Sequence, residues 1–121
     1  MKKVVLSIDD SKAVREMISF TLEPEGYRVI GAADGQQGLD QLMSASPDMV
    51  ITDLNMPVMD GLTFITKARS TPTGSGIPIV MLTTESSPDM KRKGKSAGAT
   101  GWIDKPFDAD KLIAVTKKLL G

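Results

Sequence analysis

The sequence predicts an open, doubly wound α/β fold, in which one five-stranded parallel sheet carries helices on both faces. Short apolar runs of strand length alternate with segments of helical period, and this alternation repeats five times within 121 residues. Right-handed crossovers between parallel strands place helices on both faces of the sheet. Five strands are too few to close an eight-stranded barrel. No linker or repeat interrupts the pattern, which predicts a single domain over residues 1–121.

The first unit is a strand at Val4–Ile8 followed by a helix. The strand is an apolar, β-branched run that ends abruptly at Asp9 and Asp10, which is typical of a strand buried on both faces. The helix has Ser11 as a cap and Pro24-Glu25-Gly26 as its stop. The residues that recur at helical spacing are Val14, Met17, Ile18, Thr21 and Leu22.

The second and third units follow the same pattern. Tyr27–Ala32 is predicted as a strand and Gly35–Ser44 as a helix. The side chains of this helix expected to face inward are Leu39, Leu42 and Met43. Met49–Thr52 is the third strand, and a loop over Leu54–Asp60 leads into a helix that begins at Gly61. The buried face of that helix is expected to hold Leu62, Ile65 and Ala68.

The last two units complete the sheet. A loop rich in Ser, Thr, Pro and Gly over 70–76 precedes the fourth strand, Ile79–Leu82. Pro88–Ala97 is the fourth helix, and Gly101–Ile103 is a short fifth strand. The closing helix is Asp108–Leu120. Its inward or partly inward side chains are expected to be Leu112, Ile113, Val115, Thr116, Leu119 and Leu120.

The composition excludes several kinds of chemistry. The chain has no cysteine, which excludes disulfides, thiolate nucleophiles, zinc–thiolate sites and iron–sulfur ligation. It has no histidine, which excludes a Ser–His–Asp device and the commonest transition-metal ligand. Any chemistry must therefore rest on carboxylates, hydroxyls, amines and backbone groups.

The charge pattern argues against a nucleic-acid or membrane partner. The chain holds 15 basic and 15 acidic side chains, so no global field attracts it to polyanions. The charges are unevenly divided, with 7 basic and 10 acidic residues in 1–82 and 8 basic and 5 acidic residues in 83–121. No apolar stretch approaches the length of a membrane span. We expect a cytoplasmic protein without membrane insertion.

Polar side chains follow four of the five predicted strands. Asp9 and Asp10 follow the first strand, Asp53 the third, Thr83 the fourth and Lys105 the fifth. Each residue alone is commonly a helix cap or a turn former. Parallel strands, however, bring their carboxyl ends to one edge of the sheet, where doubly wound folds bind ligands. We therefore expect these side chains to share one cleft.

The predicted cleft suits phosphoryl chemistry with a hard cation. Three carboxylates at close quarters repel, and one takes up a proton unless a cation is bound. Oxygen ligands without His or Cys favour Mg²⁺, for which Mn²⁺ can substitute. The Lys105 ammonium and the Thr83 hydroxyl suit the charge of a transferring phosphoryl group. Asp53 is the central carboxylate and the predicted nucleophile and phosphate acceptor.

This constellation resembles the two-component receiver domains of response regulators. Further segments that match the family are Asp53-Leu54-Asn55-Met56-Pro57, Asp60-Gly61, Ala97-Gly98-Ala99 and Lys105-Pro106-Phe107. The match covers essentially the whole chain. The stand-alone length and the stretch Gly101-Trp102-Ile103 are most similar to the single-domain, CheY-like receivers of chemotaxis. The resemblance implies a flavodoxin-like sheet with strand order 2-1-3-4-5.

The resemblance also implies how the acceptor and the metal ligands work. Asp53 receives a phosphoryl group from a phosphohistidine on a histidine kinase. Asp10, Asp53 and the backbone carbonyl of Asn55 bind Mg²⁺ directly, while Asp9 acts through water. The chain is then a signalling protein that catalyses its own phosphorylation and dephosphorylation, rather than an enzyme with a separate substrate.

Further roles are implied for the groups that hold the phosphate. Lys105 pairs with Asp53 or its phosphate and precedes a peptide bond to Pro106 that is usually cis in the family. The Thr83 hydroxyl and the backbone N–H of Thr84 hold phosphate oxygens.

A switch and an output face are implied as well. When Thr83 turns toward the phosphate, Trp102 is expected to swing inward, less fully than the smaller aromatic residues common at this position. Asn55 and Glu85 lie where receivers tune the lifetime of the phosphate, and their polarity predicts a short-lived signal. The fourth helix, fifth strand and fifth helix form the expected output face. The basic side chains on that helix are Lys91, Arg92, Lys93 and Lys95.

Several functions are compatible with this pattern. The leading one is a monomeric chemotaxis switch whose output partner is the flagellar switch. Alternatives are a phosphorelay intermediate and a receiver excised from a longer regulator. A more distant alternative is an aspartyl-phosphate phosphohydrolase of the haloacid-dehalogenase kind. That class requires an Asp-x-Asp motif and a substrate cap, whereas Asp9 and Asp10 are adjacent here and the sequence has no cap insertion. A flavodoxin-like FMN binder is disfavoured because no phosphate loop follows the first strand.

Overall fold

Five parallel strands form one sheet in the order β2-β1-β3-β4-β5 in the computed structural model, which describes residues 2–121. The strands are β1 Val4–Ile8, β2 Arg28–Ala32, β3 Met49–Thr52, β4 Ile79–Thr83 and β5 Gly101–Asp104. In the centre, Val5 of β1 pairs with Val29 of β2 on one side and with Met49 of β3 on the other. The predicted fold class and strand order are confirmed. The Met1 end of the predicted domain lies outside the described residues.

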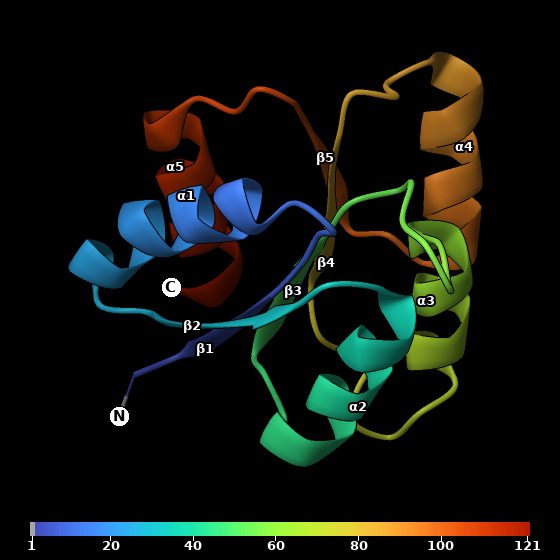
Figure 1. Ribbon diagram of the computed structural model, residues 1–121, viewed down its shortest axis with the longest axis horizontal. Coiled ribbons are helices and arrows are strands. Elements are labelled where there is room, and N and C mark those ends of the chain that lie inside the picture. The colour runs from blue at the N-terminus through green and yellow to red at the C-terminus, as the bar shows by residue number, and fades with distance from the viewer. Residues whose placement is uncertain (1) are drawn as a thin grey trace.

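The helices divide unequally between the two faces of the sheet. They are α1 Lys12–Leu22, α2 Gly35–Ala45, α3 Gly61–Arg69, α4 Pro88–Ala97 and α5 Ala109–Leu120, with a short 3₁₀ turn, η1, at Glu23–Glu25. Helices α1 and α5 cover one face, and α2, α3 and α4 cover the other (Figure 1). Because both faces are covered, each strand can be apolar on both sides.

Each helix begins after a residue whose side chain accepts a hydrogen bond from a backbone N–H of the first turn. These N-cap residues are Ser11, Asp34, Asp60, Ser87 and Asp108. Such caps satisfy N–H groups that have no partner within the helix, and each typically stabilises it by about 1 kcal/mol. The caps explain why most element boundaries agree with the sequence pattern to within one or two residues.

Two apolar layers flank the sheet, and β1 supplies both. Leu6 and Ile8 face the layer beneath α2, α3 and α4, whereas Val5 faces the layer beneath α1 and α5. Alternate residues of a strand point to opposite faces, so an uninterrupted apolar run fills both layers. Phe64 of α3 is fully buried in the first layer. The sequence pattern had not assigned Phe64 to the buried face.

Two methionines are exposed: Met17, which recurs at helical spacing in α1, and Met43, which is predicted to face inward in α2. Met17 of α1 is 49 % exposed and Met43 of α2 is 53 % exposed. Each is adjacent to a fully buried residue, Ile18 or Leu42. Consecutive helical residues differ by about 100° around the axis. The narrow buried stripe of each helix therefore accommodates one of the two neighbours and leaves the methionine at its edge.

Arg69 ties the end of α3 to the loops that precede β4 and β5. Its guanidinium donates hydrogen bonds to the carbonyls of Gly74 and Ile77, and to that of Gly98 beyond α4. These bonds hold the 70–76 segment, which forms the predicted loop, against the end of α3. Within residues 2–121, no helix combines the length and apolar character needed to cross a membrane.

Candidate functional site

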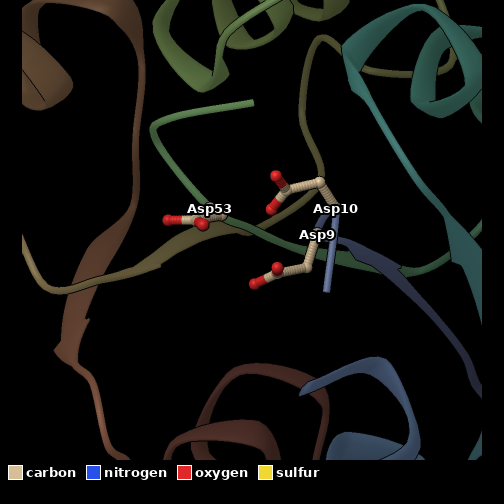
Figure 2. Close-up of side chains that lie close together, drawn as sticks. All are labelled: Asp9, Asp10 and Asp53. Carbon is tan, nitrogen blue, oxygen red and sulfur yellow. The ribbon is translucent and has the colours of Figure 1, made fainter. Parts of the chain in front are cut away.

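Three aspartates from two neighbouring strands form an acidic cluster at the carboxyl edge of the sheet. Asp9 and Asp10 follow β1, and Asp53 follows β3. The Asp53 N–H donates to the carbonyl of Ile8 at 2.9 Å, so the pairing of the two strands continues to the cluster. One oxygen from each carboxylate lies within 4.8 Å of the others, and all three turn toward the same space (Figure 2). Asp9 and Asp53 are buried, whereas Asp10 is exposed.

The local fold around Asp53 depends on the glycine that begins α3. A Cβ on Gly61 would overlap the carbonyl oxygen of Asp53, so only glycine permits this approach. The Gly61 N–H donates to the carbonyl of Leu54 at 2.8 Å. The Leu54 N–H in turn donates to Asp53 Oδ1 at 2.7 Å. The Asp60-Gly61 pair therefore holds the backbone that orients the Asp53 carboxylate.

Lys105 brings a cation to the cluster from the end of β5. Its Nζ lies 2.7 Å from Asp9 Oδ2 and 2.9 Å from Asp53 Oδ2, and its side chain is 16 % exposed. The Lys105 N–H donates to the carbonyl of Thr83 at 3.0 Å, which extends the β4–β5 pairing to this point. The bond from Lys105 to Pro106 is cis, as the family resemblance implies.

Burial and ion pairing both act on the protonation of the site. Burial raises the pKa of the Asp9 carboxyl, against the opposing hydrogen bonds from Lys105 and from the Ser11 N–H. Burial alone would lower the pKa of Lys105, but its hydrogen bonds to Asp9 and Asp53 outweigh that effect and raise it. Lys105 therefore stays cationic and offsets the repulsion expected between the carboxylates.

The donor set fits a hard divalent cation. All three acidic side chains offer oxygen ligands within reach of one another, and one of them is exposed to water. Mg²⁺ commonly takes one or two carboxylates and keeps several waters, which such a half-open cluster permits. Within residues 2–121, no side-chain hydrogen bond or ion pair engages the Asp10 carboxylate, so its oxygens are available.

The loops beside the cluster carry the other predicted residues. Thr83 is buried at the end of β4, and its Oγ1 accepts a hydrogen bond from the Glu85 N–H at 3.2 Å. The side chains of Asn55 and Glu85 are joined by a 3.2 Å hydrogen bond from Nδ2 to Oε1. The two residues predicted to tune phosphate lifetime thus contact each other across the β3–α3 and β4–α4 loops.

Trp102 lies apart from the acidic cluster, toward α4. It pairs in register with Met81 of β4 and packs partly buried against the layer that α2, α3 and α4 cover. Its indole Nε1 is buried without a hydrogen-bond partner in the described part of the chain. The ring lies over Gly94 of α4.

Two contacts of the site were not predicted from the sequence. Arg15 of α1 donates from Nη1 to the backbone carbonyl of Asp9, and Gly94 accommodates the ring of Trp102. In the sequence, an arginine in the first turns of a helix cannot be distinguished from a solvated surface residue. The only signal for Gly94 was its unfavourable position inside a helix.

The family model for the response regulator receiver domain matches residues 5–117 of this chain. The chain belongs to the response regulator receiver domain family. The two-component resemblance is thereby confirmed, and the protein is a receiver-type signalling protein.

The receiver domain is similar to parts of longer response regulators. It is 40 % identical over 116 residues to Response regulator MprA of Mycolicibacterium vanbaalenii, covering 96 % of this chain and 49 % of that protein. The MprA protein of Mycobacterium avium is 39 % identical over 116 residues, with 50 % of its length covered. The receiver domain thus spans about half the length of these relatives.

Solved structures of whole receivers are also similar. The chemotaxis response regulator CheY4 of Vibrio cholerae is 43 % identical with a TM-score of 0.93, covering 99 % of this chain and 100 % of that chain. A putative response regulator from Chloroflexus aurantiacus is 34 % identical with a TM-score of 0.93, covering 99 % and 98 % respectively. The receiver domain therefore has the CheY-like form of the flavodoxin-like fold.

Proposed function

We propose that this receiver domain is a Mg²⁺-dependent switch that accepts a phosphoryl group from a histidine kinase onto Asp53 and then changes its affinity for a protein partner. One observation carries the proposal. The Asp53 carboxylate is buried within 2.9 Å of the Lys105 ammonium and belongs to a cluster of three carboxylates whose oxygens lie within 4.8 Å. A nucleophile, a movable cation and oxygen ligands thus share one edge of the sheet.

The transfer step uses the carboxylate directly. An Asp53 oxygen attacks the phosphorus of a phosphohistidine, the P–N bond breaks, and the imidazole leaves with the electron pair, which leaves an acyl phosphate on Asp53. The Lys105 ammonium shifts from the two carboxylates to the phosphoryl oxygens, and the Thr83 hydroxyl and Thr84 N–H donate to them. These contacts offset charge that develops during transfer.

Three side chains and one carbonyl would hold the metal. Asp10, Asp53 and the backbone carbonyl of Asn55 bind it directly, and Asp9 does so through water. When bound, Mg²⁺ supplies positive charge that neutralises the phosphoryl oxygens. The same ligand set also accepts Mn²⁺.

The conformational step starts at Thr83. In this structure the Thr83 hydroxyl oxygen accepts a hydrogen bond from Glu85, so engaging the phosphate requires that this hydroxyl and the β4–α4 loop rearrange. The rearrangement alters the packing of Trp102 on the neighbouring strand. The population then shifts toward a partner-binding state.

Acetyl phosphate tests the chemistry without a kinase. With Mg²⁺, the protein should acquire an acid-stable, base-labile phosphoryl adduct, and Asp53→Asn should abolish it. Asp40→Asn, which removes a charge from an exposed position of α2, should leave the adduct unchanged. Trp102 fluorescence should change as the adduct forms. Adduct formation on Asp53→Asn would contradict the assigned acceptor, and an unchanged Trp102 spectrum would contradict the switch.

The lifetime of the phosphate should depend on the Asn55–Glu85 pair. Both residues are polar and exposed, so water has access to the acyl phosphate. Replacing both with bulky apolar residues should lengthen the half-life of the adduct, measured by its decay after the phosphodonor is removed. An unchanged half-life would show that these positions do not control hydrolysis.

The proposed output surface is the face of α4, β5 and α5, where α4 presents its four basic side chains to an acidic partner. Similarity over the whole of CheY4 supports a monomeric, cytoplasmic chemotaxis receiver of residues 1–121 acting on the flagellar switch. The half-length match to MprA supports the alternative of a phosphorelay intermediate or a receiver of a longer regulator. A pull-down with and without beryllofluoride distinguishes them, because only the first captures a flagellar switch protein in a phosphorylation-dependent way.

A further inference from the structure

We infer that Arg15 is a positioning residue for the metal-binding aspartates and acts through the backbone of Asp9. This inference rests on the proposed function, because it takes the acidic cluster to be a Mg²⁺ site. Arg15 lies in the first turns of α1, and its Nη1 donates to the Asp9 carbonyl oxygen at 2.5 Å. That carbonyl belongs to the peptide group that joins Asp9 to Asp10.

The two aspartates differ in how they are held. Asp9 is restrained at every polar group, because its N–H donates to Ala32 at 3.0 Å and its carboxylate accepts from Ser11 at 2.9 Å and Lys105 at 2.7 Å. Asp10 is exposed, and within residues 2–121 its carboxylate has no such partner. The direction of the Asp10 side chain therefore depends on the backbone that carries it, which the Arg15 contact fixes.

The stem of the Arg15 side chain lies against β2. A Cβ added at Gly31 would lie 3.3 Å from Arg15 Cδ and 3.5 Å from Nε, so the arginine stem lies directly over this glycine. Gly31 is paired in register with Ser7 of β1, two residues before Asp9. The stem thus lies on β2 close to the site, and its guanidinium donates to the Asp9 carbonyl.

Charge and positioning have opposite effects on Mg²⁺ affinity. A guanidinium beside a divalent-cation site repels the cation, so removing that charge alone should tighten Mg²⁺ binding. If Arg15 instead orients the Asp9–Asp10 peptide, removing it should weaken binding, because the ligand oxygens lose their arrangement. Loss of a residue that orients metal ligands typically lowers metal affinity about 10–100-fold.

The test is the Mg²⁺ affinity of the folded protein, measured by calorimetric titration at constant ionic strength. Arg15→Met keeps most of the stem and removes both the donor and the charge, and it should weaken Mg²⁺ binding about tenfold. Lys12→Met is the matched control, because Lys12 is an exposed cation of the same helix. Its affinity should be unchanged or slightly higher. Arg15→Lys should partly restore affinity, since one N–H makes the contact.

A second variant disturbs the contact while keeping the charge. Gly31→Ala places a methyl group against the arginine stem and should weaken Mg²⁺ binding less than Arg15→Met does. Combined with Arg15→Met it should have no further effect, because the two substitutions act through one contact. Thermal unfolding without Mg²⁺ verifies that each variant is folded.

The outcomes separate the two levels of the proposal. Arg15→Met that binds Mg²⁺ as tightly as wild type, or more tightly, overturns the positioning role while leaving the proposed function intact. Equal weakening by Lys12→Met also overturns it, because the loss of affinity would then not depend on the contact to the Asp9 carbonyl. A wild-type protein that binds no Mg²⁺ and forms no adduct overturns the proposed function itself.

Discussion

Lys105 is the residue that makes the acidic cluster compatible with a folded protein. Two buried carboxylates, Asp9 and Asp53, share its ammonium at 2.7 and 2.9 Å. Removing one partner from a buried ion pair leaves an uncompensated charge and is typically destabilising by about 3–5 kcal/mol. The lysine is thus the structural counter-ion of both buried carboxylates.

The shared ammonium predicts a specific loss of stability at alkaline pH. The pKa of Lys105 is raised above 10.5 in the folded protein, so its stabilising contribution is fully present below pH 10.5 and is lost as pH rises through the folded-state pKa. The free energy of unfolding, measured in urea on both sides of pH 10.5, should fall less for Lys105→Gln than for wild type as the pH rises. For Lys118→Gln, a substitution at an exposed position of α5, it should fall as much as for wild type.

Val58 is a second residue with a measurable consequence. It is 82 % exposed in the β3–α3 loop and has a φ of 68°, which is unfavourable for a β-branched side chain. The left-handed conformation costs such a residue about 1–2 kcal/mol, whereas asparagine tolerates it. Val58→Asn should raise the free energy of unfolding by about 1 kcal/mol, measured in urea. Val58→Thr keeps the β-branched side chain and should not raise the free energy of unfolding. If it raised that free energy as much as Val58→Asn does, side-chain polarity rather than backbone strain would explain the effect.

At the scale of elements, α4 and β5 meet at a contact that a side chain would disturb. A Cβ on Gly94 would lie 2.8 Å from Cζ3 of Trp102, closer than real contacts allow. The helix therefore carries a poor helix former where it touches Trp102 of β5. A cavity of about 250 Å³ beside this contact is lined by residues of both elements, including Lys91, Lys95 and Trp102.

This contact predicts that Gly94→Ala changes the free energy of unfolding in opposite directions with and without the Trp102 ring. Gly94→Ala should destabilise wild type and shift Trp102 fluorescence, because the new methyl group displaces the ring. In a Trp102→Ala background the same substitution should stabilise by about 1 kcal/mol, the difference in helix propensity. Unfolding monitored by circular dichroism measures the change in the free energy of unfolding in both backgrounds. Ser96→Ala, at an exposed site of α4, should change the free energy of unfolding by the same amount in both backgrounds. If Gly94→Ala also had the same effect in both backgrounds, the steric contact would be excluded.

At the scale of the whole molecule, the site depends on tertiary structure because four strands contribute to it. The cluster joins β1 to β3, Lys105 joins it to β5, and Thr83 lies at the end of β4. The unfolded chain cannot hold these groups together, so a ligand of the cluster binds the folded state preferentially.

Mg²⁺ should accordingly stabilise the apo protein. At a Mg²⁺ concentration about 100 times Kd, linkage predicts a gain of about 2.7 kcal/mol in the free energy of unfolding. Asp10→Asn should lose most of that increment, whereas Asp40→Asn should keep it. Chemical unfolding with and without Mg²⁺ at matched ionic strength measures the difference. An equal increment for Asp10→Asn would remove Asp10 from the ligand set.

Much of the fold and the site follows from local patterns. The alternation of apolar runs and helical segments predicted the parallel sheet, because period and hydrophobicity are properties of adjacent residues. Topology then predicted that Asp9, Asp10, Asp53 and Lys105 would meet, since parallel strands share one carboxyl edge. The structure brings these four side chains together.

Local sequence patterns thus account for the fold class, the element order and the edge where the charged residues gather. The packing of the elements sets how the charges are balanced and which small residues make close contacts possible. The Lys105 bridge, the Arg15 contact to the Asp9 carbonyl and the fit of Trp102 over Gly94 each join elements distant in the chain. Such contacts depend on the relative placement of packed elements, which no local periodicity encodes.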